Sequence, residues 1–224
     1  MAATDAIDII HYDQALIVVN KPAGLPVLPD GWDAQAPYLL DQLQQSFGRL
    51  WVVHRLDKVT SGVMILARSA AAHRMLSIQF ERHEAIKIYD AIASGSPPWN
   101  EKVARHRLRV NVGHQHRTQV DHRHGKSSET AFTVQTRWKA HTLIEARPLT
   151  GRSHQVRAHL AALGHPLLGD ALYGAPPTAL IGRPALHARS LGFRHPETSQ
   201  PLTFTAPWAD DFTRALSALK SGQI

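Results

Sequence analysis

The sequence contains no cysteine. This absence excludes disulfides, catalysis by a thiolate and zinc sites built from cysteine, and it favours a cytoplasmic protein. Long apolar runs are also missing, since residues 15–19 and 63–67 are among the longest and a bilayer-spanning helix needs roughly 20. No basic stretch followed by an apolar one opens the chain, so no secretory signal is expected. We therefore expect no membrane association.

Internal repeats, low-complexity tracts and a clear linker are lacking as well. With 224 residues and a hydrophobic content of 43%, the chain is long enough to bury a sizeable core. The length fits one large domain or two small halves that share a core. We expect residues 1–224 to form a single domain, with residues 1–6 flexible.

Positive charge is in excess, with 25 lysines and arginines against 18 aspartates and glutamates, a net charge of +7. A basic surface is the electrostatic footprint of a nucleic-acid-binding protein, although an ordinary soluble protein fits this charge equally well. Arginine, unlike lysine, pairs bidentately with phosphate and stacks on bases. The central third of the chain is rich in it, at Arg105, Arg107, Arg109, Arg117 and Arg123.

Short apolar runs and period-two alternation predict many strands, separated by turn residues. They are expected within residues 7–19 (two strands around a turn at 12–14), 52–53, 63–66, 86–93, 103–112, 132–136, 142–147, 186–193 and 201–204. Helical spacing predicts a helix capped by Ser69, another beginning near Ser153 and ending at Gly164, and a short one at 38–47. Residues 113–128 are polar and basic, and we expect a mobile loop there. This mixture predicts an α+β fold.

One stretch, residues 52–68, places the polar insert HRLDKVTSG between two apolar runs. A turn with a capping aspartate and a solvated arginine would explain a shorter motif. Here an imidazole, a guanidinium, a carboxylate, an amine and two hydroxyls occur together. The combination resembles the catalytic loop HRLDxxTSG of the RluA-type pseudouridine synthases.

Further segments resemble the same family, in the family's order. They are NKPAG at 20–24, KIYDA at 87–91, TGRSHQVRAHL at 150–160, GHPLLGDALYG at 164–174 and LHA at 186–188. The resemblance runs from about residue 8 to about residue 208 and is weakest at about 95–128. On the residues alone, NKPAGLPVLP is expected to be a rigid structural loop. GDALYG is expected either to be a turn capped by Asp170 or to orient the site through Asp170.

The resemblance implies a catalytic domain with two halves around a long mixed, mostly antiparallel sheet, with flanking helices and a central cleft. It implies that uridine in RNA is converted to its C-glycoside isomer, by breaking the bond from ribose to ring nitrogen and remaking it to carbon 5. Because the reaction is an isomerisation, no cofactor and no metal are implied. Some relatives carry a small RNA-binding domain before the catalytic one, and we expect none here.

By this resemblance Asp57 is the essential carboxylate. It must be ionised, either to attack the ribose or to act as a base there, and both roles stay open. An ionised carboxylate in a pocket that excludes water needs a counter-charge, and the matching residue is Arg157. Periodicity alone would instead make Arg157 an exposed arginine on a helix. Tyr89 matches a tyrosine that can stack on uracil and accept a proton, although a half-buried strand tyrosine is its simpler reading.

Arg55 matches an arginine that fills the RNA stack after the target base has been flipped out, as access to carbon 5 requires. The other residues expected to bind RNA are His54, Arg152, Arg117, Arg123 and Lys126. Single-domain relatives act on stem-loops of transfer RNA, large-subunit ribosomal RNA or both, so RNA of these kinds is the expected partner. We expect a monomer with no obligate protein partner.

Two alternatives come from other classes of protein. A non-catalytic RNA-binding protein on the same fold is disfavoured by the intact Asp57, Tyr89 and Arg157. A metal-dependent hydrolase would draw its ligands from the His-rich segment 114–124, which also holds Asp121. Arg117 and Arg123 would repel a cation there, so the segment is expected to contact RNA phosphates without a metal.

Overall fold

A computed structural model describes residues 7–29 and 35–222, and the expected flexibility of residues 1–6 lies outside this range. The chain divides into two compact units. The first comprises the described residues up to Ile86 together with Ala188–Pro207, and the second comprises Lys87–His187 and the described residues from Trp208 onward. Two strands, β5 and β10, begin in one unit and continue in the other.

The first unit contains the neighbouring strands β1-β2-β4-β10, and β3 pairs with β4 and β11 with β10; the pairs β1–β2, β2–β4, β3–β4 and β10–β11 are antiparallel. Their bounds are Asp8–Tyr12 (β1), Leu16–Lys21 (β2), Trp51–Val52 (β3), Ser61–Ala67 (β4), Leu186–Arg194 (β10) and Pro201–Thr205 (β11). Every residue of β4 is buried, and so are all but one of β2. Such continuous burial is expected of strands that are covered on both faces.

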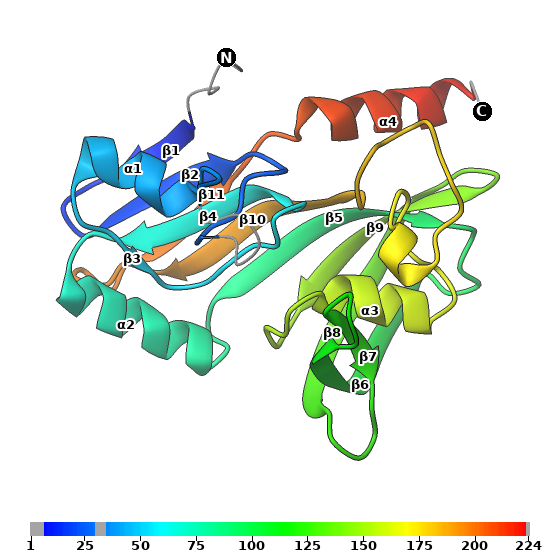
Figure 1. Cartoon of the computed structure of the whole chain (residues 1–224), viewed down its shortest axis with the longest axis horizontal. Coiled ribbons are helices and arrows are strands. Elements are labelled where there is room, and N and C mark those ends of the chain that lie inside the picture. Colours follow the sequence, from blue (N-terminus) through cyan, green and yellow to red (C-terminus); the bar gives the residue numbers. More distant parts are fainter. Residues whose placement is uncertain (1–6, 30–34, 223–224) are drawn as a thin grey trace. The chain divides into compact units, whose positions relative to one another are not determined.

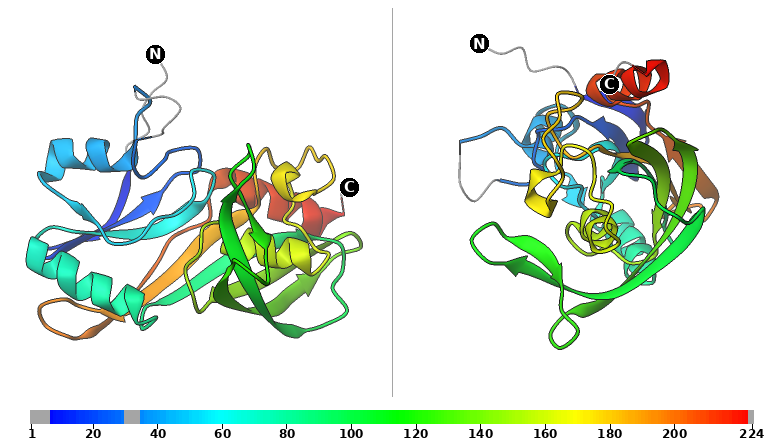
Figure 2. Two further views of the ribbon diagram at one scale, coloured as in Figure 1. Left: turned by 60° about the horizontal axis from the view of Figure 1, so that its bottom comes forward. Right: turned by 90° about the vertical axis from the view of Figure 1, so that its right-hand side faces the viewer.

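Two helices provide that cover, α1 (Leu39–Phe47) and α2 (Ala70–Glu81), and they lie on opposite sides of these strands (Figures 1 and 2). Ser69 caps α2, because its side chain accepts a hydrogen bond from the Ala72 backbone N–H at 3.1 Å. Both helices and the Ser69 cap confirm the sequence prediction.

The second unit is an antiparallel sheet in the order β5-β9-β8-β6-β7. Its strands are Ile86–Ser94 (β5), Glu101–Val112 (β6), Arg117–Val120 (β7), Lys126–Arg137 (β8) and His141–Pro148 (β9). Its helices are α3 (Gln155–Ala162), the short 3-10 turn η1 (Ala171–Tyr173) and α4 (Asp210–Ser221). Alternation along β5 separates two cores, since Ala91 and Ala93 pack with α3 residues whereas Ile92 packs with α4 residues.

Two features of this unit differ from the sequence prediction. Residues 113–128 hold β7 and the beginning of β8, where a mobile loop is predicted. Here backbone pairing orders the segment, and only occasional side chains such as Thr118 and Ser128 are buried. The segment therefore has no apolar pattern from which its strands could be predicted. The helix α4 is missed, although Phe212, Ala215, Leu216 and Leu219 form an apolar stripe at helical spacing.

The predicted α+β fold class is confirmed by these elements. Among residues 7–29 and 35–222, no helix is both long and apolar enough to cross a membrane.

Candidate active site

Asp57 lies half-buried in the loop that joins β3 to β4 in the first unit. Its backbone carbonyl accepts a hydrogen bond from the Thr60 N–H at 3.0 Å, which closes a tight turn over residues 57–60. On either side of it, Leu56 is buried in the core and Arg55 is exposed. The loop therefore anchors itself through Leu56 while its charged side chains face outward or lie at the surface.

The NKPAG stretch holds this loop from the other side. Lys21 is fully buried, and its ammonium donates hydrogen bonds to the carbonyls of Pro22 and Leu25, both at 2.8 Å, and of Lys58 at 3.2 Å. The backbone N–H of Gly24 also donates to the Lys58 carbonyl, at 2.8 Å. NKPAG is therefore a rigid support for the residue that follows Asp57, as its structural reading predicts.

Gly62 lets β4 leave the loop beside β10. Its φ is +118°, in the region that favours glycine, and a Cβ at this position would lie 2.2 Å from the backbone oxygen of Ala188. Any larger residue would force the two strands apart. The Ser-Gly end of the motif is thus explained by a close backbone approach.

His54, a predicted RNA contact, is bound into the first unit. Its Nε2 accepts a hydrogen bond from the Ile65 N–H at 3.2 Å, and its ring stacks on Phe80 of α2 with centroids 4.5 Å apart. Because Nε2 is an acceptor here, the proton of the neutral ring is on Nδ1. These contacts fix the start of the loop, and RNA binding by His54 remains a prediction.

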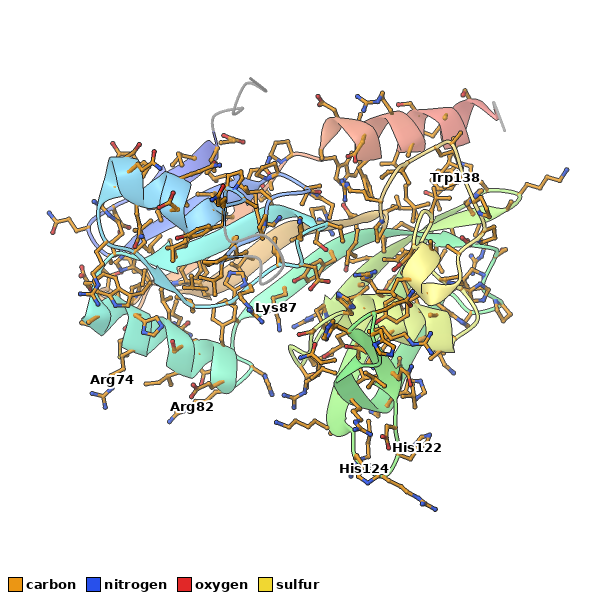
Figure 3. The ribbon with its side chains drawn as sticks, viewed as in Figure 1. Arg74, Arg82, Lys87, His122, His124 and Trp138 are labelled. Carbon is orange, nitrogen blue, oxygen red and sulfur yellow. The ribbon has the colours of Figure 1, made fainter. Side chains whose placement is uncertain are left out.

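Tyr89 and Lys87 lie on β5 of the second unit, two residues apart and therefore on the same face. Tyr89 is partly buried and packs against the core that includes Phe132 and Val156. The Lys87 ammonium donates to the Thr150 carbonyl at 3.1 Å, and burial lowers the pKa of Lys87 to about 8. Figure 3 labels this lysine.

Arg157 is buried, with 4% of its surface exposed, so the exposed position that periodicity predicts is wrong. Its guanidinium donates to both oxygens of Asp170, from Nε at 2.7 Å and from NH2 at 2.8 Å. It also lies over the Tyr173 ring, 5.0 Å from the centroid. Six successive residues, 155–160, are buried because α3 is covered on more than one side, and a stripe-based prediction fails for such a helix.

Asp170 lies at a turn, but the predicted cap by its side chain is wrong, because η1 has no side-chain cap hydrogen bond and the carboxylate binds Arg157. Its carbonyl accepts the N–H groups of Tyr173 and Ala175, at 3.0 and 3.1 Å. Its carboxylate, 1% exposed, forms the buried ion pair with Arg157. A bidentate pair of this kind fixes the plane of the guanidinium.

Gln155 is a site residue that the sequence reading missed. Its side-chain oxygen accepts from the Thr150 hydroxyl at 2.7 Å and from the Arg152 N–H at 3.0 Å. Its amide nitrogen donates to the Glu129 carbonyl and the Thr130 hydroxyl, at 2.9 and 3.0 Å. This glutamine therefore connects the loop before α3 to β8. In the sequence, a polar residue at the start of an apolar helix was the signal that could have identified it.

Arg152, predicted to bind RNA, belongs to the loop that Gln155 holds. Its NH2 donates to the Ser127 carbonyl at 3.3 Å, whereas its buried Nε has no hydrogen-bond partner among residues 7–29 and 35–222. The side chain is therefore incompletely satisfied within the protein. An acceptor from a bound ligand would complete it.

An exposed basic face runs along β6 and β7, and we call these two strands with the turn 121–125 the basic arm. Arg105, Arg107 and Arg109 alternate along β6 and are all exposed. The register pairs Arg109 with Gln119, so Arg117 lies on the same face, whereas Lys126 pairs with the buried Leu108. The register therefore assigns Arg117 to this arginine face and Lys126 to the other side.

The turn of the basic arm is organised by Asp121. Its carboxylate accepts the backbone N–H groups of Arg123 and His124, both at 2.9 Å, and these bonds lower its pKa, with the bond from His124 the largest cause. It also lies 3.6 Å from NH1 of Arg109. The exposed His122 and His124 are labelled in Figure 3. Within the described ranges no three His, Cys, Asp or Glu side chains could hold a metal ion together, so the hydrolase alternative gains no support.

Comparison with known proteins supports the family suggested by the motifs. The model of the RNA pseudouridylate synthase family matches residues 15–162. The chain is 37% identical over 203 residues to the dual-specificity RNA pseudouridine synthase RluA of Pasteurella multocida, covering 90% of this chain and 93% of that protein. It is 36% identical to the ribosomal large subunit pseudouridine synthase D of Neisseria meningitidis, covering 96% of this chain and 62% of that protein.

Solved structures agree with these matches. The human RNA pseudouridylate synthase domain containing 1 superposes with a TM-score of 0.77 at 26% identity, covering 93% of this chain and 86% of that one. The chain therefore belongs to the RNA pseudouridylate synthase family, and within it to the RluA-type enzymes. It is accordingly an RNA pseudouridine synthase by class, which leaves the non-catalytic alternative without support.

Proposed function

We propose that this chain converts specific uridines in structured RNA, in stem-loops of transfer RNA, large-subunit ribosomal RNA or both, to pseudouridine. The relatives support these substrate classes, since one is a dual-specificity RNA pseudouridine synthase and another is a ribosomal large subunit pseudouridine synthase. The reaction needs no oxidant, reductant or group donor, because uridine and pseudouridine contain the same atoms. The protein has only to position the RNA, keep Asp57 ionised and flip the target base out of the stack.

The observation that carries the proposal is the family match across residues 15–162, which includes the complete HRLDKVTSG loop. Within it, Asp57 is the essential carboxylate, acting on the ribose as nucleophile or base. Tyr89 stacks on the freed uracil and accepts a proton, and Arg157 supplies the charge that keeps Asp57 ionised. The buried pair of Arg157 with Asp170 supports this role, because it holds the guanidinium in one orientation.

Base flipping is the step proposed for Arg55, whose exposed guanidinium is suited to stacking in the vacancy left by the target base. The backbone of the RNA is proposed to lie along the basic arm and the Arg152 loop. His54, Arg117, Arg123 and Lys126 complete the proposed contacts. We also propose that the chain works as a monomer.

Tritium release from carbon-5-labelled uridine tests this proposal. The substrate is a pool of unmodified transfer RNA transcripts and large-subunit ribosomal RNA fragments. Wild-type protein should release tritium, and Asp57→Asn should release none while its affinity for the RNA stays within about twofold, because the two side chains have nearly the same size. Asp41→Asn, an exposed aspartate on α1, is the matched control and should behave as wild type. An active Asp57→Asn variant would refute the role of Asp57.

The basic arm makes a separate prediction about salt. Arg117→Ala should weaken binding of the same RNA pool and lower the slope of log affinity against log salt by about one, as expected for one lost phosphate contact. Lys126→Ala should lower the slope by less, because Lys126 pairs with the buried Leu108 and not with an arginine. Filter binding at several salt concentrations measures both slopes. Equal slopes for wild type and Arg117→Ala would contradict binding of phosphate by the arginine face.

A further inference from the structure

Tyr173 lies at the end of η1 and contacts three separate parts of the second unit. The Arg157 guanidinium lies over the face of its ring, 5.0 Å from the centroid, while Asp170 binds the edge of that guanidinium. The ring face and the carboxylate together restrict both the plane and the position of the charge. Arg157 is therefore held by two neighbours three residues apart.

The hydroxyl of Tyr173 continues these contacts toward the basic arm. It accepts a hydrogen bond from the backbone N–H of Thr118 in β7 at 2.9 Å. The same hydroxyl forms a hydrogen bond with Nδ1 of His154 at 3.2 Å. Burial raises the pKa of Tyr173, opposed by the bond from Thr118, so the phenol stays protonated at neutral pH.

A second link joins the same places. The Thr118 hydroxyl donates to the Ser153 carbonyl at 2.8 Å, so β7 is bound to the residue before His154. His154 itself has φ 54° and ψ 20°, a left-handed conformation that is costly for a residue other than glycine, and it is the N-cap of α3. The start of the helix that carries Arg157 is therefore strained and is held by contacts with the basic arm and Tyr173.

We propose that Tyr173 is a positioning residue that couples the basic arm to Arg157. RNA bound to the basic arm fixes β7. The contacts of β7 through Thr118, Tyr173 and His154 then fix the start of α3 and the position of the Arg157 guanidinium. Tyr173 touches neither of the reacting atoms in this account. The inference rests on the proposed function, because it assigns Arg157 a working orientation during pseudouridine formation.

A purely structural Tyr173 would behave differently. If the ring only filled space, its variants would lower thermal stability, and the folded fraction would react at the normal rate. If it positions Arg157, the rate constant at saturating RNA falls even where stability does not. Tyr173→Phe keeps the ring over Arg157 and removes the hydroxyl, whereas Tyr173→Leu removes the aromatic face as well.

The experiment measures single-turnover tritium release from the labelled RNA pool, with enzyme in excess at two concentrations to establish saturation. Tyr173→Phe should react more slowly by on the order of tenfold, the usual effect of one lost hydrogen bond, and Tyr173→Leu should be slower still. Thr118→Val should be slowed severalfold because it removes the bond to Ser153, whereas Thr118→Ser retains a hydroxyl and should react normally. Tyr12→Phe and Thr136→Val, both exposed, are the matched controls.

Melting temperature and RNA affinity are measured on the same preparations. Slower turnover by Tyr173→Phe at saturating RNA, with affinity within about twofold of wild type, supports the coupling. Wild-type rates in both Tyr173 variants, or losses confined to melting temperature or to affinity, overturn it while leaving the proposed function intact. A wild-type protein that releases no tritium from the pool overturns both proposals.

Discussion

The two units differ in how their functional residues are distributed along the chain. In the first, the polar residues of the candidate site fall within nine consecutive positions, HRLDKVTSG, supported by NKPAG. In the second, Arg157 depends on Asp170 and Tyr173, which follow it by more than ten residues, and the contacts continue to Thr118 in β7. The first site is thus contained in one motif, whereas the second is assembled by the fold.

The interiors of the two units also differ, in the polar groups that they bury. The strands β2 and β4 at the centre of the first unit are apolar apart from Asn20, Lys21, Ser61 and Gly62. The second unit buries an ion pair and a hydrogen-bonded network around His159, a fully buried residue. Buried polar groups are costly unless every partner is present. The second unit should therefore be the more sensitive of the two to single polar substitutions.

The largest effect is expected for Asp170→Ala, which leaves the buried Arg157 without its carboxylate. Removing one partner of a buried pair costs about 3–5 kcal/mol of unfolding free energy. Urea denaturation at neutral pH measures the loss. Asp211→Ala removes the partner of Arg183 in the same unit, but Asp211 is 32% exposed and the loss should be clearly smaller. Equal losses would show that burial of the Arg157 pair does not set its importance.

The first unit is probed by Lys21→Met, which keeps the length of the side chain and removes its ammonium. The carbonyls of Pro22, Leu25 and Lys58 lose a buried donor, so we expect a loss of about 2–3 kcal/mol in the same assay. Lys139→Met, at an exposed position, should change little. If Lys21→Met is as stable as wild type, NKPAG does not support the Asp57 loop as we infer, and the difference in polar burial between the two units matters less.

Acid should affect the second unit before the first. Burial lowers the pKa of His159 to about 4, with a smaller contribution from His106, and its Nε2 and Nδ1 bond the hydroxyls of Ser128 and Thr130, both at 2.9 Å. The unfolded chain therefore takes up this proton first, and stability is lost as pH falls from about 6.5 toward 4.

Unfolding free energy should drop by about 2 kcal/mol between pH 7 and pH 5 through His159, and His159→Gln should abolish that part of the pH dependence. Asp13 of the first unit has its pKa lowered to about 2, because hydrogen bonds led by that from His11 outweigh the effect of burial. Its contribution is lost only as pH falls below about 4. A wild-type protein with the same stability at pH 7 and pH 5 would contradict the role given to His159.

The sequence predicts the strands, the helix α2 with its Ser69 cap and the Asp57 loop, because each is encoded by neighbouring residues. It does not predict the burial of Arg157, since periodicity describes a helix covered on one side and α3 is covered on several. The strand β7 is not predicted for another reason, because backbone pairing rather than apolar side chains orders it. Asp170 and Gln155 lie within segments that resemble the family, but only the fold reveals which groups they bind.

We propose above that this chain forms pseudouridine in RNA through Asp57. The most direct measurement maps pseudouridines across total RNA from cells that lack the gene, complemented with wild type or with Asp57→Asn. We predict that specific sites in transfer RNA or large-subunit ribosomal RNA lose pseudouridine on deletion, regain it with wild type and stay unmodified with Asp57→Asn. Identical maps in all strains, or sites restored by Asp57→Asn, would contradict the claim.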